Sequence, residues 1–451
     1  MDRNSPRSCH WIGVEDGWQE RRELPRRVGL PITDLKNHAL VIGATGSGKT
    51  NLLHHLIAQD IRFGHSFCVL DLHGDMADAS LDLLAGHIPV SKTFLLDLHE
   101  QHFPSGFDVF GGKGEPYYRA LGLLKAVRDE SAQWGPLIDD SMRNGFMLLA
   151  EVKEPITKLE ALFSDPSFLR NCLDRAKPSP TVDFWLRYLE MSREKRDAFA
   201  NPIRNKVSPL LATATLRNIL SHPRPLDLKQ HLDTRGSALL ISLVVQELHA
   251  SGRMMGRIVL ASLLREIFSR AGTPERARNP VHLFVDEFEN FGTENFEEIL
   301  AEARKFRLGL ILAHQNTSQL PPKLRATVLG NVGAKVVFRC GREDAQLLSR
   351  DLTGDPKALD LANLKTGHAI LWTREGGVTP IEVNAPIVQN LGARSPRARA
   401  LVRALQKRWG ASPSEFPSED RASRPRVTTK TEEQPRQQKP KTSMEDWICG
   451  N

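Results

Sequence analysis

The chain has 451 residues, of which 40% are hydrophobic and 25% charged, an ordinary composition for a globular protein of two or three domains. It contains no apolar run of 18 residues and no apolar core of a signal peptide, so we expect a cytoplasmic protein without a direct membrane span. Its formal charge of +7 is compatible with nucleic acid as a partner, and its five scattered cysteines have neither a metal-ligand spacing nor the even number of a disulfide framework.

The first two regions of the chain show a mixed pattern and then an alternating one. Residues 1–35 hold aromatic and basic residues and are expected to form short strands or turns that lead into the core. In residues 36–111, the apolar runs "HALVIG", "SFCVLDLHGD" and "KTFLLDLH" are predicted strands, and the amphipathic stretches between them are predicted helices. This β-α-β alternation predicts an α/β fold, in which a parallel sheet carries helices on its faces.

The pattern changes twice more along the chain. Residues 112–235 lose the strand pattern and show helical periodicity interrupted by prolines, which predicts an all-α insertion. Strand patterns return in residues 236–395 with "SALLISL", "VHLFVDEF", "LGLILAHQ", "AKVVFRCG" and "GHAILWT", so two stretches of chain are expected to build one mostly parallel sheet. Residues 396–451 begin with a basic helix that could grip DNA or a partner, and continue into a Pro-, Ser- and Gln-rich tail that is expected to be disordered.

The stretch "GATGSGKT" matches the phosphate-binding pattern G-x-x-x-x-G-K-[ST]. Its glycines let backbone N–H groups approach a phosphate, Lys49 is expected to reach the β- and γ-phosphate oxygens, and Thr50 to hold Mg²⁺. The alternative is a tight turn with an uninvolved lysine, which the strand before the loop and the helix after it disfavour. The predicted nucleotide-binding residues are Gly43, Ala44, Thr45, Gly46, Ser47, Gly48, Lys49, Thr50 and Asn51.

A pair of carboxylates follows the apolar run "VHLFV". Asp286 and Glu287 are therefore expected at the carboxyl end of a buried strand, the edge where open α/β sheets bind phosphates. In a nucleotide hydrolase, Asp286 would hold Mg²⁺ and Glu287 would orient and polarise the attacking water. The alternative is a strand that simply ends in an acidic turn.

The run "EARKFRLGLILAHQ" supplies two further candidates for catalysis. Gln315 follows a predicted strand, so its amide could stand beside the γ-phosphate and sense it. Arg304 lies before the strand and carries a permanently charged fork suited to transition-state oxygens, which it could offer in trans. The alternative for Arg304 is a solvated basic helix end. The predicted catalytic residues are Lys49, Glu287, Arg304 and Gln315.

Other groups of polar residues predict less. Asp71, His73 and Asp75 could suggest a metal site, but a structural turn around Gly74 is the favoured interpretation. Adjacent histidines on the first helix point about 100° apart and cannot share one metal. No Cys/His pair has the spacing of a zinc site or a nucleophilic triad.

The motifs "GATGSGKT", "VLDLHGD", "WGPLIDDSMRNG", "FVDEFENF", "EARKFRLGLILAHQ" and "NVGAKVVFRCGREDA", in this order, resemble the conjugative coupling proteins of type IV secretion. These form the VirD4/TraD/TraG group of the FtsK/HerA superfamily of P-loop ATPases. The resemblance covers about residues 36–390. It implies a RecA-like ATPase core with an inserted all-α domain, the cofactors ATP and Mg²⁺, and a homo-oligomer, expected to be a hexamer, that moves DNA and hydrolyses ATP at subunit interfaces.

The resemblance also implies roles for single residues. Lys49 and Thr50 match the Walker A pair, and Asp286 and Glu287 match the Walker B pair. Gln315 matches the sensor and Arg304 the arginine finger that reaches a neighbouring subunit. Arg339 and Arg342 match a basic segment near the nucleotide and are weaker candidates.

One departure from the family leaves alternatives open. Coupling proteins usually carry an N-terminal transmembrane anchor, for which this sequence has no candidate. The protein would then act at the inner membrane through a separate channel partner, or it would be a HerA-like motor that works with a nuclease in repair or defence. A third alternative is a nucleotide-gated adaptor that recruits a relaxase or another protein without pumping DNA.

Overall fold

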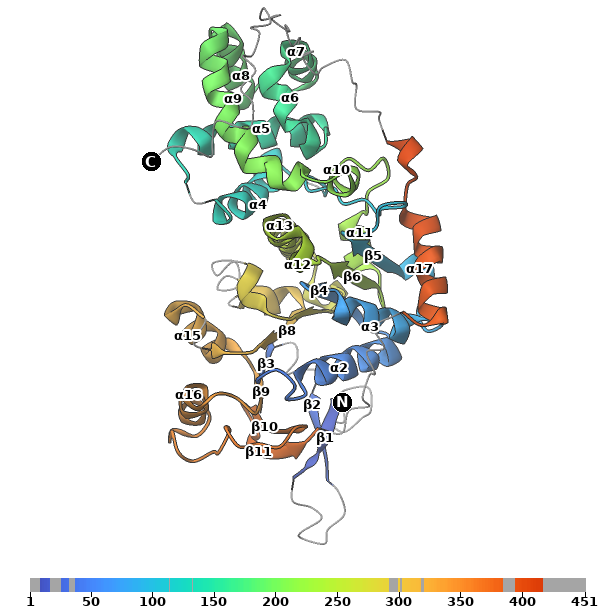
Figure 1. Cartoon of the computed structure of the whole chain (residues 1–451), viewed down its shortest axis with the longest axis vertical. Coiled ribbons are helices and arrows are strands. Elements are labelled where there is room, and N and C mark those ends of the chain that lie inside the picture. Colours follow the sequence, from blue (N-terminus) through green and yellow to red (C-terminus); the bar gives the residue numbers. More distant parts are fainter. Residues whose placement is uncertain are drawn as a thin grey trace, which may run out of the picture. The chain divides into compact units, whose positions relative to one another are not determined.

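An eleven-stranded sheet forms the centre of the described structure, a computed structural model (Figure 1). The compact unit that contains this sheet ends at Phe416. The tail that the sequence predicts to be disordered lies outside the described residues. The structure describes residues 9–16, 26–31, 37–112, 114–131, 133–291, 299–300, 302–317, 320–383 and 394–416.

The strand order is β2-β1-β11-β10-β9-β3-β8-β7-β4-β6-β5. The strands are β1 (Cys9–Glu15), β2 (Arg27–Pro31), β3 (Ala39–Ile42), β4 (Ser66–Asp71), β5 (Thr93–Asp97), β6 (Ala238–Ser242), β7 (Val281–Val285), β8 (Leu308–His314), β9 (Ala334–Phe338), β10 (His368–Thr373) and β11 (Gly377–Glu382). Six of the ten neighbouring pairs, from β9 across to β5, are parallel, and the four pairs at the β2 end are antiparallel. The sheet is therefore mostly parallel, as the sequence predicts.

The register of the central strands aligns their carboxyl ends. Ile42 at the end of β3 pairs with His314 at the end of β8, and Val285 at the end of β7 lies opposite Leu312. Strand β4 is the next neighbour of β7. The residues that follow β3, β8, β7 and β4 consequently meet at one edge of the sheet, where ligands of open α/β sheets bind.

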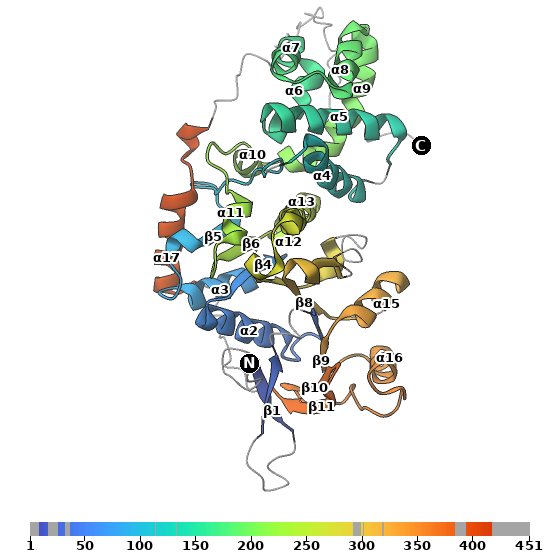
Figure 2. The same cartoon turned by 180° about the vertical axis from the view of Figure 1, so that it is seen from behind.

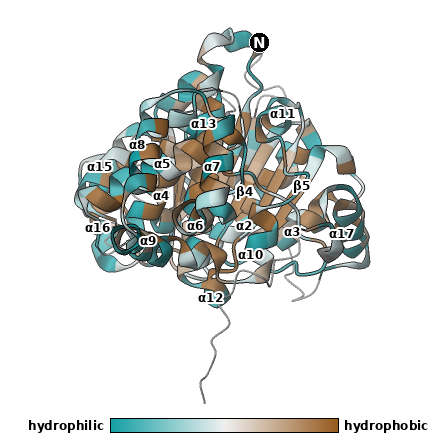
Figure 3. Ribbon diagram, turned by 90° about the horizontal axis from the view of Figure 1, so that it is seen from above, coloured by the Kyte–Doolittle hydropathy of each residue, from teal (hydrophilic) through white to brown (hydrophobic). Residues whose placement is uncertain are grey.

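Side chains from alternate positions of each central strand enter two different hydrophobic clusters. In β3, Leu40 and Ile42 belong to one cluster, whereas Ala39 and Val41 belong to the other. Because successive side chains of a strand point to opposite faces, this division shows that both faces of the sheet are covered. The hydrophobic strands β4 and β5 lie among helices whose outer surfaces are more hydrophilic (Figure 3).

The helices fall into a group that flanks the sheet and a group inserted between β5 and β6. The flanking helices are α2 (Lys49–Phe63), α3 (Asp75–Leu84), α12 (Val245–Leu248), α13 (Ala250–Phe268), α15 (Pro322–Asn331), α16 (Arg342–Thr353) and α17 (Pro396–Trp409). The inserted helices are α4 (Pro116–Asp129), α5 (Pro136–Val152), α6 (Leu159–Ser164), α7 (Pro166–Arg175), α8 (Pro180–Glu190), α9 (Arg193–Val207), α10 (Ala214–Leu220) and α11 (Leu228–Asp233). The predicted α/β fold with an all-α interruption is thus confirmed. None of the described helices is both long and apolar enough to cross a membrane.

Two features of the sheet and its cover differ from what the sequence suggests. Strand β11 has no clear apolar pattern, since Ile381 is its single buried residue and it contains Pro380, but it pairs with β10 and β1 at the antiparallel end. The predicted basic helix is α17, and its apolar side is packed: Leu401 and Leu405 are buried, and the Trp409 indole donates to the Thr93 carbonyl at 2.8 Å. Both views show α17 beside α3 and β5 (Figures 1 and 2).

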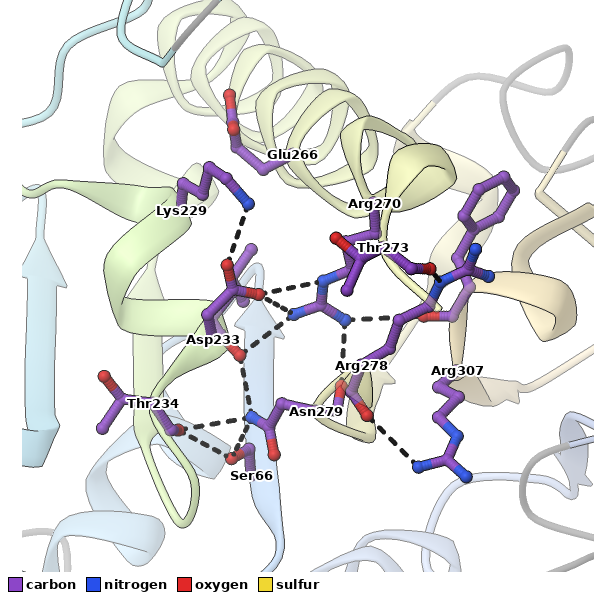
Figure 4. Close-up of polar contacts among 12 residues, drawn as sticks. Ser66, Lys229, Asp233, Thr234, Glu266, Arg270, Thr273, Arg278, Asn279 and Arg307 are labelled. Atoms are coloured by element: carbon purple, nitrogen blue, oxygen red, sulfur yellow. Dashed lines mark hydrogen bonds and ion pairs between the residues drawn. The ribbon is translucent and has the colours of Figure 1, made fainter. Parts of the chain in front are cut away.

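A buried arginine joins the carboxyl end of α11 to the segment before β7 (Figure 4). The Arg270 guanidinium donates to Asp233 at the end of α11, to the Leu232 carbonyl at 3.0 Å and to the Asn279 carbonyl at 2.9 Å. The Asn279 amide in turn donates to Ser66 at the start of β4 at 2.9 Å. Since Arg270 is only 2% exposed, these bonds satisfy a charge that would be costly to bury alone.

Candidate nucleotide-binding site

The loop between β3 and α2 has the backbone conformation of a phosphate-binding turn. Gly46 and Gly48 have φ angles of 72° and 118°, values that L side chains rarely adopt. Gly48 caps α2, and its carbonyl accepts the first helical hydrogen bond from Leu52 at 3.1 Å. The free N–H groups of the first turn of α2 therefore face the loop, and the positive end of the helix dipole lies there.

The first glycine of the loop is needed for close packing. A Cβ atom on Gly43 would lie 2.6 Å from both Phe338 Cβ and Ser47 Oγ. The next residue, Ala44, donates its N–H to the Arg339 carbonyl at 2.7 Å, which fixes the loop to the end of β9. The Ser47 hydroxyl is buried and has no hydrogen-bond partner among the described residues. An unpaired buried polar group in a glycine-walled turn fits a loop shaped for an anion.

Lys49 is the first residue of α2 and is 6% exposed. Within the described part of the chain, its amine makes no hydrogen bond or ion pair. Burial lowers the pKa of Lys49, and the nearby Asp286 and Glu287 oppose that shift. A buried, unpaired cation beside carboxylates fits a site that gains its counter-charge from a bound phosphate. Thr50, one residue later, is exposed.

Asp286 and Glu287 directly follow β7, as the sequence predicts. Burial raises the pKa of Asp286, an effect that Lys49 opposes. The Asp286 carboxylate accepts the backbone N–H of Glu287 at 2.9 Å. Glu287 has a φ angle of 50°, so it sits in the left-handed region that non-glycine residues seldom adopt. Backbone strain of this kind is often found at functional sites.

Two side chains from neighbouring strands hold the Glu287 carboxylate. The Gln315 amide, just after β8, donates to Glu287 Oε1 at 2.8 Å, and its own oxygen accepts from the Thr45 hydroxyl at 3.0 Å. His73 Nε2, just after β4, lies 3.0 Å from Glu287 Oε2. Gln315 thus links the phosphate-binding loop to Glu287, and His73 holds the other side of the same carboxylate.

The His73–Glu287 pair shifts the pKa of both groups. Its hydrogen bond to Glu287 raises the pKa of His73 to about 9, and the same contact lowers the pKa of Glu287. His73 is therefore an imidazolium at neutral pH. Its second nitrogen, Nδ1, lies against the side-chain amide of Gln246, which follows β6.

The sequence missed the roles of His73 and Gln246. It places His73 only within a turn, and the turn does exist: Asp71 accepts the N–H groups of His73 and Ala77, each at 2.9 Å. Their position in the sequence could have indicated a place at the site, because both residues follow strands of the parallel sheet. Their contact with Glu287 depends on strand order, which the sequence does not reveal.

Arg304 does not join this group. It lies on the short helix η7 (Ala303–Phe306) before β8, is exposed, and donates to the Asn37 side chain at 3.3 Å. Asn37 precedes β3, whereas the phosphate-binding loop follows it. Arg304 is therefore at the opposite edge of the sheet from the loop of its own chain. Arg339 and Arg342 are also exposed, and they follow β9 on the same edge as the loop.

A cavity of about 740 Å³ lies elsewhere, between α11 and the segment after β5. Its charged lining residues are Asp108, Asp227, Asp233 and Lys229. Three carboxylates and one amine disfavour a triphosphate, and the cavity shares no residue with the loop at residues 43–50. The carboxyl edge of the sheet therefore remains the candidate nucleotide site.

Two family models match parts of the chain. Residues 280–357 match the model described as the TraM recognition site of TraD and TraG, and residues 19–121 match the central domain of the helicase HerA. The predicted resemblance to the coupling proteins of the FtsK/HerA superfamily is confirmed. The first match contains Asp286, Glu287, Arg304 and Gln315, and the second contains the phosphate-binding loop. No curated protein matched the chain.

Solved structures of coupling proteins have the same RecA-like fold. The conjugative coupling protein TrwB without its first 70 residues, in an unbound form, superposes with a TM-score of 0.60 at 17% identity, over 86% of this chain and 91% of that one. TrwB with ADP and Mg²⁺ superposes with a TM-score of 0.59 at 18% identity, over 86% of this chain and 96% of that one. A third structure, VirB4 of Thermoanaerobacter pseudethanolicus, superposes with a TM-score of 0.55 at 13% identity, over 84% of this chain and 97% of that one. The predicted RecA-like core of this coupling-protein-like chain is thereby confirmed.

Proposed function

We propose that this protein is an ATPase of the conjugative coupling-protein type, which hydrolyses ATP at the subunit interfaces of a homo-oligomeric ring to move or deliver DNA. The observation that carries the proposal is the position of Glu287. Its carboxylate lies at the carboxyl edge of the sheet, held by Gln315 and His73, beside the buried amine of Lys49. A protein that only bound nucleotide would not need a carboxylate in this position.

ATP binding falls to the loop and the first turn of α2. The backbone N–H groups of residues 43–51 surround the β-phosphate, and Lys49 neutralises the β- and γ-phosphate oxygens. The Thr50 hydroxyl and the Asp286 carboxylate hold Mg²⁺, since oxygen donors of this kind suit that ion. When bound, Mg²⁺ neutralises the charge that develops on the phosphates.

Glu287 orients and polarises the attacking water. In the arrangement described here, both of its oxygens are engaged by His73 and Gln315. Because both contacts compete with water for the lone pairs of this carboxylate, exchange of one side-chain partner for water should favour hydrolysis. Gln315 contacts the phosphate-binding loop through Thr45. A γ-phosphate in the loop would therefore shift the Gln315 side chain first, and through it the contact with Glu287.

The position of Arg304 supports hydrolysis between subunits. The residue is exposed at the edge of the sheet away from its own loop, so it cannot serve that site without refolding. In a head-to-tail ring, two different surfaces meet at every interface, so the edge that carries Arg304 can face the loop edge of the next subunit. Arg304 of one subunit would then stabilise the transition state bound by the next.

Nucleotide binding by variants tests this proposal. Lys49→Ala should weaken binding of a fluorescent ATP analogue with Mg²⁺ by at least about tenfold, because a phosphate contact is lost. Glu287→Gln should bind the analogue like the unmodified protein but hydrolyse ATP ~10²- to 10⁴-fold more slowly, the usual range for a lost general base. Unchanged hydrolysis by Glu287→Gln would refute the assigned role.

A second function is favoured by the family model on residues 280–357, whose description is a recognition site for a protein. The chain would then be a nucleotide-gated adaptor that recruits a relaxase-like partner and does not pump DNA. The HerA match on residues 19–121 supports another variant, a DNA motor that works with a nuclease. ATP hydrolysis stimulated by DNA separates either motor from the adaptor.

A further inference from the structure

Four buried or half-buried polar side chains converge far from the nucleotide site. They are His10 on β1, Asp60 near the end of α2, His65 in the turn before β4, and His282 on β7. One candidate ligand atom from each residue lies within 4.8 Å of all the others. These residues stand at positions 10, 60, 65 and 282, so no local spacing in the sequence indicates the cluster.

The three imidazoles surround the one carboxylate almost evenly. His10 Nε2 lies 2.8 Å and His65 Nδ1 3.0 Å from Asp60 Oδ1, and His282 Nδ1 lies 2.9 Å from both carboxylate oxygens. The ring centroids are 5.6, 5.8 and 5.8 Å apart. Every imidazole presents one nitrogen to the same small volume.

The cluster lacks a permanent positive charge. Asp60 and His10 are 0% exposed, and within the described residues the only ion-pair partners of Asp60 are these three histidines. Neutral imidazole nitrogens are the form that ligates metals. A buried carboxylate is costly unless a positive charge compensates it.

We propose that His10, Asp60, His65 and His282 bind a Zn²⁺ ion. Three imidazole nitrogens and one carboxylate oxygen are donors that Zn²⁺ accepts in a tetrahedral site, with bonds of ~2.0–2.2 Å. Tetrahedral bonds of that length place donor atoms roughly 3.3 Å apart. The present nitrogen–oxygen distances of 2.8–3.0 Å need to open by only a few tenths of an ångström.

The site would be structural. All four coordination positions are filled by protein, which leaves none for a substrate or a reactive water. Asp60 is eleven residues after Lys49 on α2, a rise of about 16 Å along the helix. The ion would thus anchor the far end of the helix that begins at the phosphate-binding loop, and it would fasten β1 to β7. The half-buried His65, with 22% of its side chain exposed, gives the ion a route of entry.

A metal-free arrangement is the competing structure. In it, the three imidazoles contact the Asp60 carboxylate through hydrogen bonds alone. The outer nitrogens His10 Nδ1 and His282 Nε2 are buried and have no partner among the described residues, an observation that favours the metal-free arrangement. Metal-bound imidazoles usually donate their second N–H to a partner. The metal content of the protein decides between the two.

The test uses the full chain without a histidine tag, produced in medium with added zinc and purified without chelators. Mass spectrometry of the metals should find about one zinc per chain. His65→Gln removes one ligand at the most exposed member of the cluster and should reduce the zinc to less than about 0.3 per chain after dialysis. The exposed His87→Gln serves as the matched control and should keep the zinc of the unmodified protein.

A second measurement on the unmodified chain does not depend on any variant folding. Chelation should lower the melting temperature, and stoichiometric Zn²⁺ should restore it, because an ion that binds only the folded state stabilises it. Less than about 0.1 zinc per chain, with no change of melting temperature on adding Zn²⁺, would overturn the proposal. Zinc that is retained in full by His65→Gln would overturn it as well.

Discussion

His73 Nε2 and Glu287 Oε2 lie 3.0 Å apart, although 214 residues separate them in the sequence. The contact exists because β4 and β7 are neighbours and both end at the same edge of the sheet. It occupies the carboxylate that we assign to the attacking water. We therefore expect His73 to restrain hydrolysis until nucleotide or DNA changes the contact.

Removal of this restraint should raise the basal rate. In His73→Gln, Glu287 loses a charged partner, so hydrolysis without DNA should increase about two- to fivefold. The range corresponds to the ~0.5–1 kcal/mol of a partly exposed ion pair, reduced by solvent screening. Steady-state kinetics of the variant and of the exposed-residue control His87→Gln measure it. A tenfold fall in kcat at unchanged KM would show instead that His73 assists the reaction.

The charge on His73 should depend on Glu287. Since the hydrogen bond to Glu287 raises the pKa of His73 to about 9, Glu287→Gln should return it toward the ordinary value of 6.5. NMR of histidine-labelled protein follows the titration directly. A value below 6.5 for His73 in the unmodified protein would contradict the pairing.

The same shift predicts how the pair contributes to stability. An imidazole whose pKa is raised by folding contributes fully below its unfolded pKa, near 6.5, and loses that contribution as the pH rises through about 9. Because Glu287 must also be ionised, the difference in melting temperature between the unmodified chain and His73→Gln should be largest between about pH 4.5, the ordinary pKa of a glutamate, and pH 6.5, and should disappear above pH 9. A difference in melting temperature that grows with pH would be evidence against this contribution of the His73–Glu287 pair to stability.

Arg304 should act on the site of a neighbouring subunit. Arg304→Ala and Lys49→Ala should each be nearly inactive alone, since a finger in trans is typically worth a factor of ~10³ to 10⁵. An equimolar mixture should restore hydrolysis at about a quarter of the interfaces, where an intact Lys49 meets an intact Arg304 by random assembly. Lys305→Ala, the adjacent exposed cation, is the control and should stay active. Absence of rescue at every ratio would count against action in trans.

Gly43 should tolerate no side chain. Gly43→Ala places a Cβ 2.6 Å from Phe338 Cβ and Ser47 Oγ, so we expect a loss of ~1–3 kcal/mol in the free energy of unfolding and weaker ATP binding. Gly330→Ala in α15 meets nothing within 4 Å and should be neutral or slightly stabilising. Denaturant unfolding compares the two, and equal stabilities would mean that the loop has room to relax.

The sequence predicts well what is local in the chain. The loop at residues 43–50, the pair Asp286 and Glu287, and Gln315 each follow directly on an apolar strand, so a short window suffices to find them. The contacts of His73 and the cluster around Asp60 depend on which strands become neighbours. Strand β11 was missed because its exposed residues carry no hydrophobic pattern.

Helix α17 also shows that a sequence pattern does not reveal how an element packs. The sequence predicts a basic helix but not its packing: Leu401 and Leu405 are buried, and Arg394, just before the helix, pairs with Asp78 and Asp97. Truncation after Gly392 should therefore cost on the order of 5 kcal/mol of stability, at ~1.5–3 kcal/mol per buried aliphatic side chain. Truncation after Phe416, where the compact unit ends, should leave the melting temperature unchanged and is the matched control. Equal melting temperatures of the two truncations would contradict the packing of α17.

In the proposed function, ATP hydrolysis at Glu287 drives work on DNA. Steady-state hydrolysis by the purified full chain, with and without single- and double-stranded DNA and beside Glu287→Gln, tests it most directly. We predict strong stimulation by DNA that weakens with added salt, as contacts to phosphates do, and that is abolished in Glu287→Gln. Hydrolysis that depends on Glu287 but is the same with and without either form of DNA would contradict the claim and favour the adaptor.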